Sequence, residues 1–304
     1  MTLPVAADGV GDRMQAAFDE WRGDVATMGQ LGTGTRVDGT WQVTAGATAA
    51  ELASVSKSIT AVCALQLVEE GVLDWSDTLP DRLGKGPDVT AAQLVTHSSG
   101  LTLDVTQAAM PGWLDDADTA HKSAAILDVL VDADGIAGAP NRYAYNNVNY
   151  ALLALMIEAA TGQGFVEACW PRLGLTLDIR ASARSGAFGP WGGLEATPAG
   201  YLGFLHRHFG PGSLIGTDPF AYPHVEIGGG AYYGLGMVFR PFRGSYNFWH
   251  FGALCFPNRL ETGSFAVIWE GRHSALALYD ACVDWDSMSA LDAALAGAVY
   301  GAGP

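Results

Sequence analysis

The sequence predicts an α/β protein of the α+β type, with an antiparallel sheet flanked by helices and an inserted, mainly helical lobe. Strand patterns occur near both ends of the chain, whereas residues 73–221 consist of short helical patterns rich in Asp, Gly and Pro. Helical patterns also lie at the two ends, beside those strands. We therefore expect residues 1–72 and 222–304 to build a sheet lobe, with the terminal helices packed on it, and residues 73–221 to form the inserted lobe.

The first predicted elements are a helix and a hairpin. Residues 8–22 carry apolar side chains at helical spacing, namely Val10, Met14, Phe18 and Trp21. Residues 33–37 and 40–44 read as strands and flank Asp38-Gly39, a strong signal for a two-residue hairpin turn.

Further helices and three late strands follow. A long apolar helix starts at Ser54 and should end near Gly71, because glycine is common just after a helix. Other helical patterns cover residues 124–131, 149–161 and 198–209, and a shorter one ends in a turn within residues 94–101. The late strands are predicted at 232–239, 246–253 and 265–270, with turns at Gly244 and Gly263 and a final helix at 287–300.

The bulk composition limits the possible partners. The chain has 304 residues and a formal net charge of −16, which argues against binding to nucleic acid or to an anionic membrane. The longest apolar run, from Tyr150 to Ile157, is too short to cross a bilayer, and no signal peptide is visible. We expect a small-molecule substrate and no cofactor or metal, since His206-x-His208 lacks a third ligand and fits a solvated helix face. The oligomeric state is left open.

The cysteines suggest a location. Their spacing is wide and contains no C-x-x-C pair, and they are Cys63, Cys169, Cys255 and Cys282. This usage is typical of reduced core thiols rather than a disulfide framework. Together with the absence of a visible signal peptide, it predicts a cytoplasmic protein.

The first candidate for chemistry is Ser54-Val55-Ser56-Lys57. Residues three apart on a helix share a face, so the Ser54 hydroxyl should lie beside the Lys57 amine. A serine becomes nucleophilic when a neighbour takes its proton, and a lysine can do so only if its pKa is lowered, for example by burial. The apolar helix that follows would supply that burial. The alternative is a serine-rich helix start with a lysine that reaches solvent.

Two later stretches offer the remaining parts of such a site. In Tyr145-Asn146-Asn147, the phenol can transfer a proton near a lysine and the Asn147 amide can orient that lysine. Alternatively, this stretch is an Asn-rich helix cap with packed tyrosines. In the late strand, His250 precedes Gly252 and Ala253, whose backbone could approach a substrate and stabilise an oxyanion. The alternative is an ordinary histidine in a sheet.

Several aromatic residues have two interpretations as well. His97 is either a spare catalytic base or a structural residue in a turn, and the turn favours the structural role. Five others either line an apolar acyl pocket or pack in the core, namely Trp113, Trp191, Tyr222, Tyr232 and Tyr233.

Taken in order, S-x-x-K, Y-x-N and H-x-G resemble the serine β-lactamase and penicillin-binding-protein superfamily. The resemblance is greatest to its class C-like branch, which holds family VIII esterases, D-aminopeptidases and amidases. Shorter stretches agree with that branch: LVTHSSGL at 94–101, YNNVNYALL at 145–153, GGLEAT at 192–197 and YGLG at 233–236. The resemblance extends over about residues 50–270 and implies a β-lactamase/transpeptidase-like fold.

The resemblance also implies an acyl-enzyme mechanism. Ser54 would attack a carbonyl, while Lys57 and Tyr145 would share the base and acid roles. Asn147 would position Lys57 and the substrate, and the N–H groups of Ser54 and Ala253 would form the oxyanion hole. Which of Lys57 and Tyr145 takes the first proton is left open.

One departure from the family pattern affects the predicted substrate. His250 stands where the third motif commonly has a lysine, and a histidine is mostly neutral near pH 7. This favours a small ester or amide over a substrate that carries a carboxylate, and predicts a carboxylesterase- or amidase-like serine hydrolase. One alternative is a β-lactamase or D-amino-acid peptidase/amidase. Another is a non-catalytic β-lactamase-like binding protein that has lost turnover.

Overall fold

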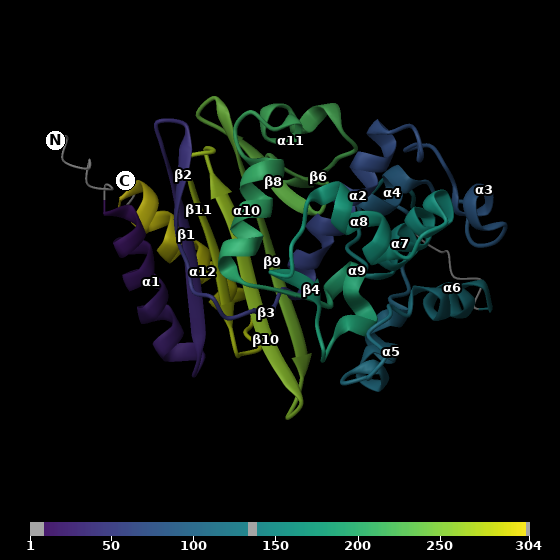
Figure 1. The fold of residues 1–304 in the computed structure, drawn as a ribbon, viewed down its shortest axis with the longest axis horizontal. Helices are drawn as coiled ribbons and strands as arrows, with labels where there is room; N and C mark the ends of the chain where they lie inside the picture. The colour runs from purple at the N-terminus through teal and green to yellow at the C-terminus, as the bar shows by residue number, and fades with distance from the viewer. Residues whose placement is uncertain (1–8, 133–138, 302–304) are drawn as a thin grey trace.

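An antiparallel sheet is the largest element of the computed structural model, which describes residues 9–132 and 139–301. Its eight strands run in the order β2-β1-β11-β10-β9-β8-β7-β6 (Figure 1). The first strands of the chain therefore lie beside the last, with Gly32 opposite Leu276. The strands are β1 (Gly29–Val37), β2 (Thr40–Thr44), β6 (Val225–Gly228), β7 (Ala231–Gly234), β8 (Met237–Phe242), β9 (Ser245–Phe256), β10 (Leu260–Trp269) and β11 (His273–Tyr279).

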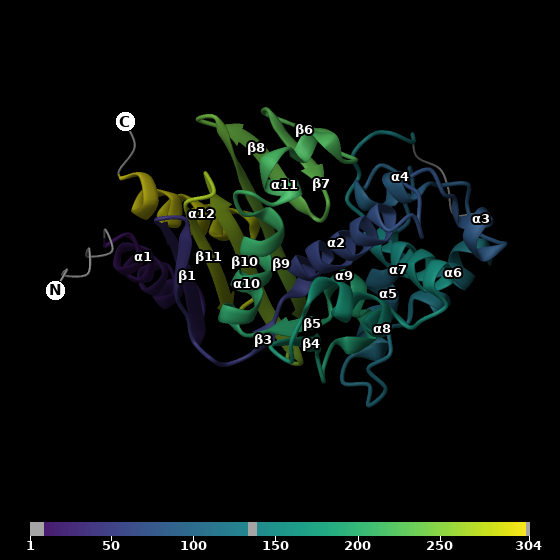
Figure 2. The same cartoon turned by 45° about the horizontal axis from the view of Figure 1, so that its top comes forward.

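Helices cover both faces of this sheet. α1 (Val10–Val25) and α12 (Trp285–Tyr300) contact each other and share one buried apolar cluster with β10 and β11. On the other face, α10 (Pro198–Phe209) packs against β1 and β11 (Figure 1). α2 (Ser56–Glu69) extends from the sheet into the remaining helices, as Figure 2 shows, and belongs to the larger of the two apolar clusters.

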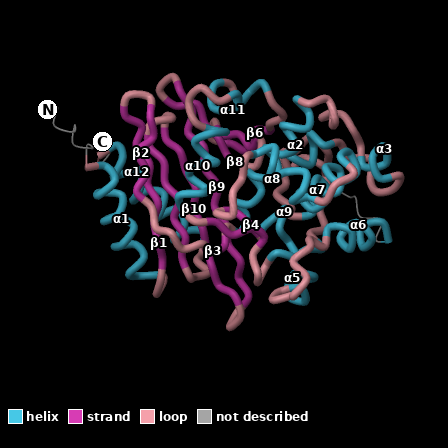
Figure 3. Tube along the Cα trace, viewed as in Figure 1, coloured by secondary structure: helices cyan, strands magenta, loops and turns pink. Residues whose placement is uncertain are grey.

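The remaining helices gather at the end of the molecule away from α1 and α12 (Figure 3). They are α3 (Leu79–Leu83), α4 (Ala91–Val95), α5 (Val105–Trp113), α6 (Ser123–Asp132), α7 (Val148–Thr161), α8 (Phe165–Leu173) and α9 (Gly189–Gly192). The short α11 (Leu214–Thr217) instead packs against α10. A small second sheet, β3-β5-β4, consists of β3 (Ala50–Glu51), β5 (Leu194–Ala196) and β4 (Ile179–Ala181). Among the described residues, no helix is long and apolar enough on its own to cross a membrane, and one bent pair, α7 with α8, passes by length and composition only.

The antiparallel sheet with flanking helices confirms the predicted fold class. α1, the β1–β2 hairpin, α7, α10 and α12 lie close to their predicted places, and the hairpin turn has positive φ at Asp38 and Gly39. The lobe boundaries at residues 72 and 222 stay a prediction. Within the segment assigned to the helical lobe, α10 packs on the main sheet.

The structure differs from the predicted late strands in three places. The strand expected at 232–239 is a hairpin, because Leu235 and Gly236 have φ values of 50° and 78° and turn the chain between β7 and β8. The turn expected at Gly263 is absent, since that glycine lies inside β10, where the Tyr279 ring occupies the space of a Cβ. β11 was not predicted. All its residues are buried, so it lacks the alternation that marks a half-exposed strand.

The prediction of reduced thiols was also wrong. Cys63 of α2 is bonded to Cys169 of α8, and Cys255 of β9 is bonded to Cys282. The Cα atoms of each pair are 5.3 Å apart, within the usual range for a disulfide. Sequence spacing missed both bonds because 106 and 27 residues separate the partners.

Candidate active site

Ser54 lies where α2 meets the main sheet. It belongs to a short 3-10 turn, Ala53–Val55, directly before α2, rather than to the α-helix that the sequence predicted. This turn contacts β9 and β10. Ala53 has a φ of 46°, a left-handed conformation that costs free energy for a residue with a side chain. Such strain is typical of functional sites, where the surrounding structure enforces it.

Two glycines let the sheet approach this turn and α2. A Cβ at Gly252 of β9 would lie 2.8 Å from the backbone nitrogen of Ser54. A Cβ at Gly236, in the β7–β8 turn, would lie 2.6 Å from the carbonyl oxygen of Lys57. Both distances are too short for any side chain. The H-x-G and YGLG stretches therefore hold Ser54 and Lys57 against the sheet.

Lys57 is buried and has three polar partners. Its Nζ lies 3.1 Å from Ser54 Oγ, 2.8 Å from Asn147 Oδ1 and 2.5 Å from the carbonyl oxygen of Trp191. Burial lowers the pKa of Lys57 to about 7, although the charge of Asp104 opposes this shift. A substantial fraction of Lys57 is therefore a neutral amine at pH 7. Since Asn147 Oδ1 and the Trp191 carbonyl only accept hydrogen bonds, that amine donates to both and offers its lone pair to the Ser54 hydroxyl.

The orientation of Asn147 follows from its second partner. Its Nδ2 donates to Asp104 Oδ2 at 3.3 Å, so its Oδ1 is free to accept from Lys57. Asp104 also caps α5 by accepting from the backbone N–H of Thr106. Asp104 thus fixes the asparagine amide and supplies the negative charge nearest to Lys57.

Tyr145 lies beside Lys57 and Ser54. The Lys57 Nζ is 4.9 Å from the centre of its ring. The side chain lines an open pocket and is 42% exposed, yet desolvation of the phenol raises the pKa of Tyr145 well above its ordinary value. The hydroxyl of Ser54 opposes this shift only in part. At neutral pH the phenol therefore keeps its proton and can act as a donor.

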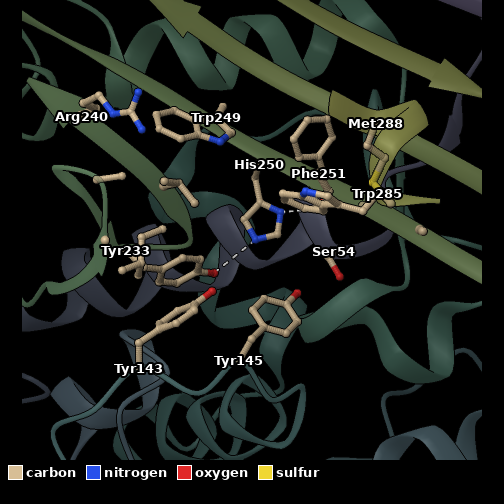
Figure 4. A pocket seen from close by; sticks show the side chains of 16 residues that line it. Ser54, Tyr143, Tyr145, Tyr233, Arg240, Trp249, His250, Phe251, Trp285 and Met288 are labelled. Carbon is tan, nitrogen blue, oxygen red and sulfur yellow. Dashed lines mark hydrogen bonds between the residues drawn. The ribbon is translucent and has the colours of Figure 1, made fainter. Parts of the chain in front are cut away.

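His250 is uncharged and its tautomer can be assigned. Its Nδ1 lies 2.5 Å from the carbonyl oxygen of Phe251, which can only accept, so Nδ1 carries the proton. Its Nε2 then accepts from the Tyr233 hydroxyl at 3.4 Å (Figure 4). Burial, aided by the nearby Lys57, lowers the pKa of His250 to about 3. No positive charge therefore arises from this position near neutral pH.

Ala253 and Ser54 adjoin the same open strand edge. β8 pairs with β9 only as far as Trp249, opposite Val238, so residues beyond it have no neighbour from β8. The 3-10 turn of Ser54 contacts this part of β9. The structure thus brings Ala253 and Gly252 beside Ser54, an arrangement that is compatible with the predicted oxyanion hole.

Two pockets meet at Ser54 and Ala253. The larger, which we call the sheet pocket, has a volume of about 580 Å³ (Figure 4). Its side chains are mostly apolar or aromatic and include Tyr143, Val238, Trp249, Phe251, Trp285 and Met288. The smaller, which we call the helix pocket, has a volume of about 180 Å³ and includes Gln107, Met110, Asn147 and Trp191. A reacting carbonyl at Ser54 could therefore place one part of the substrate in each pocket.

A family model described as Beta-lactamase matches residues 22–183, more than half of the chain. This chain belongs to the beta-lactamase family. It is a member of the serine beta-lactamase and penicillin-binding-protein superfamily, as its motifs indicated. Penicillin-binding protein 4* of Bacillus subtilis (strain 168) is 35% identical over 125 residues, which are 38% of this chain and 26% of that protein. Protein flp of Staphylococcus aureus (strain MW2) is 29% identical over 128 residues, 38% of this chain and 24% of that protein. The chain therefore matches about a quarter of the length of these curated relatives.

Solved structures with this fold cover almost the whole chain. The D-stereospecific amidohydrolase from Streptomyces sp. is 19% identical with a TM-score of 0.72, covering 96% of this chain and 99% of that one. The D-amino acid amidase from Ochrobactrum anthropi SV3, complexed with D-phenylalanine, is 14% identical with a TM-score of 0.73, covering 97% and 100%. At these identities the likeness shows the fold of this beta-lactamase family member.

His97 packs against the loop that carries Tyr145 and Asn147, and its contacts indicate a structural role. It is buried, and its Nδ1 accepts from the backbone N–H of Asn146 at 3.3 Å and from Asn149 Nδ2 at 3.0 Å. Its ring lies 4.3 Å from the ring of Tyr145. Burial and the nearby Lys57 hold the pKa of His97 well below its ordinary value. These contacts favour the structural interpretation, in which LVTHSSGL supports the loop of Tyr145 and Asn147.

The structure places two unpredicted groups in the candidate site and places three of the predicted aromatic residues outside its pockets. Asp104 and the Trp191 carbonyl were not predicted as partners of the Lys57 network, and only GGLEAT pointed near Trp191. Among the five aromatic candidates, Trp191 and Tyr233 line the two pockets, whereas Trp113, Tyr222 and Tyr232 do not.

The His206-x-His208 face is packed rather than solvated as predicted. His206 stacks on Trp41 at 3.8 Å and lies 2.7 Å from Ser274 Oγ. The described residues contain no group of three His, Cys, Asp or Glu side chains that could hold a metal.

Proposed function

We propose that this protein is a serine hydrolase that forms an acyl-enzyme on Ser54 and hydrolyses a small ester or amide. The observation that carries the proposal is the buried Lys57, whose Nζ contacts Ser54 Oγ and whose pKa is lowered to about 7. A neutral amine at this place can take the proton of Ser54, which makes the hydroxyl nucleophilic. A lysine that served only for packing would not need polar partners on three sides.

The proposed reaction assigns different roles to Lys57 and Tyr145. Lys57 takes the Ser54 proton as Oγ attacks the carbonyl, because its pKa makes it the better base of the two. The backbone N–H groups of Ser54 and Ala253 stabilise the oxyanion. Tyr145, which keeps its proton, relays a proton from Lys57 to the leaving group as the carbonyl bond to that group breaks. A water molecule then attacks the acyl-enzyme and gives one of its protons to Lys57, which is neutral again at this stage. That proton passes to Ser54 Oγ as the acyl bond to Ser54 breaks and the carboxylic acid leaves.

The direct test is intact-protein mass after incubation with a fluorophosphonate. The parent should gain one adduct and Ser54→Ala none, while the matched control Ser76→Ala, which changes an exposed serine, should label like the parent. Ester hydrolysis should disappear in Ser54→Ala with little change in melting temperature. Labelling of Ser54→Ala to the same extent as the parent would refute Ser54 as the nucleophile.

The first alternative is a β-lactamase or a D-amino-acid peptidase/amidase. The two similar structures are a D-stereospecific amidohydrolase and a D-amino acid amidase, which supports an amide as the substrate of this chain too. Among the described residues, however, no Asp or Glu lines the two pockets at Ser54, so a free amino group would have no counter-ion there. We therefore prefer an ester or an amide without a free amine.

The non-catalytic alternative predicts a different result in the same experiment. A binding protein that had lost turnover would give no adduct on either variant. The intact contacts among Ser54, Lys57 and Asn147 support catalysis instead.

The disulfides bear on the predicted cytoplasmic location. The predicted cytoplasmic location rested partly on free thiols, and the two disulfides remove that ground because such bonds persist mainly in oxidising compartments.

A further inference from the structure

The sheet pocket contains a single side chain with a fixed positive charge among the described residues that line it, Arg240 of β8. Its guanidinium carbon lies 5.6 Å from the centre of the Trp249 ring. Figure 4 shows these two side chains at one end of the pocket and Ser54 toward the other, with His250 between them. The cation is thus part of the pocket wall but distant from the reacting group.

Arg240 has no strong partner of its own. Within the described part of the chain its guanidinium makes no hydrogen bond, and no carboxylate oxygen lies within 4.0 Å of it. Asp292 of α12 interacts with it electrostatically. On another side lies the β6–β7 turn, where even a Cβ at Gly229 would be 3.8 Å from its Nη2. The five N–H donors of the guanidinium are therefore available to a ligand.

The strand spacing gives the scale of the separation between this cation and Ser54. Trp249, whose ring faces Arg240, and Ala253, which adjoins Ser54, are four positions apart along β9. At about 3.3 Å per strand residue, these two residues are roughly 13 Å apart. The pocket wall between them includes Phe251 and Trp285, and Trp285 is 67% exposed. An apolar chain or ring of a substrate could cover these side chains, and the burial of apolar surface on both sides would favour binding.

We propose that Arg240 binds an anionic group, such as a carboxylate, at the end of the substrate distant from the scissile carbonyl. This inference rests on the proposed function and names its substrate class: an ester or amide with an apolar body and a terminal anion. It agrees with the uncharged His250, which disfavours an anion close to the reacting carbonyl. A planar guanidinium is also well suited to a carboxylate, because it offers two parallel donors.

The test compares matched charged and neutral esters. We would use mono-p-nitrophenyl esters of linear dicarboxylic acids, and p-nitrobenzoate esters of linear ω-hydroxy acids, each beside its methyl-capped neutral analogue. The measured quantity is the ratio of kcat/KM for the charged ester to that for the neutral one. In chains of about eight to ten carbons, long enough for the distance above, Arg240→Gln should lower this ratio by about tenfold in at least one series. Arg240→Lys should retain part of the preference. Chains of about four carbons cannot reach Arg240, so their ratio should not change.

Controls separate this inference from the proposed function. Arg272→Gln removes the same charge from an exposed arginine outside both pockets and should leave every ratio as in the parent. In a Ser54→Ala background, calorimetric binding of the long charged and neutral esters reports the effect of Arg240→Gln without turnover. Binding that depends on Arg240 supports the inference even if none of the esters is hydrolysed. The absence of hydrolysis would count against the proposed function only. Ratios and affinities that do not depend on Arg240 in either series, or that change equally with Arg272→Gln, would overturn the inference.

Discussion

The proposed chemistry depends first on one lysine. Lys57 acts as a base only when it is neutral, and its pKa is lowered to about 7. The kcat/KM for a neutral ester should therefore rise about tenfold per pH unit below pH 7 and level off above it. His250, with a pKa lowered to about 3, should not contribute to this limb. The measurement is a pH–rate profile between pH 5 and 9, and a limb near pH 10 would contradict the lowered pKa.

Asp104 allows the assignment of that limb to Lys57 to be tested. Its negative charge favours the protonated lysine and raises the pKa of Lys57. Asp104→Asn keeps an oxygen that can accept from the Asn147 amide but removes the charge. The limb should consequently move to lower pH, by about one unit. Asp19→Asn, an exposed change in α1, is the control and should not move it. A shift to higher pH would exclude the proposed electrostatics.

At the scale of elements, the contact between the β7–β8 turn and α2 leaves no room for a side chain at Gly236. Gly236 has a φ of 78°, and a Cβ there would meet the backbone of Lys57 and Ser58. Gly236→Ala should lower the free energy of unfolding by about 2–4 kcal/mol, since it adds both backbone strain and overpacking. Urea denaturation measures this difference.

A second glycine provides the control for that substitution. Gly203 lies in α10 with open space around its Cα, so Gly203→Ala should stabilise the protein by up to about 1 kcal/mol through helix propensity. If both variants changed stability by the same amount, the close approach of the turn to α2 would not be the cause.

For the whole molecule, the two disulfides are the main unexpected covalent feature. Cys63–Cys169 links α2, which carries Lys57, to α8, and its partners are 106 residues apart in the sequence. Protein kept from reductants should have an intact mass about 4 Da below that of the four-thiol form, because each bond removes two hydrogens. Replacing Cys63 and Cys169 by alanine should cost about 2–5 kcal/mol of stability. Four titratable thiols in the unfolded, unreduced protein would refute the bonds.

The sequence by itself determined the features that depend on neighbours along the chain. The spacing of Ser54 and Lys57, the hairpin at Asp38-Gly39 and the periodic helices are local patterns, and each was predicted correctly or nearly so. The ordered motifs also identified the family, because each one carries the residue types that its contacts require. Gly252 and Gly236, for example, were singled out only by their motifs.

Only the tertiary structure decided what depends on contacts between distant segments. The Trp191 carbonyl contacts Lys57 across 134 residues, and the charge of Asp104 acts on Lys57 across 47, and no periodicity reports either interaction. The same holds for the disulfides, for the fully buried β11, and for Arg240, which faces a pocket only because β8 pairs with β9. Sequence patterns record which face of an element is buried, whereas the pKa of Lys57 and the charge of a pocket depend on what packs against that face.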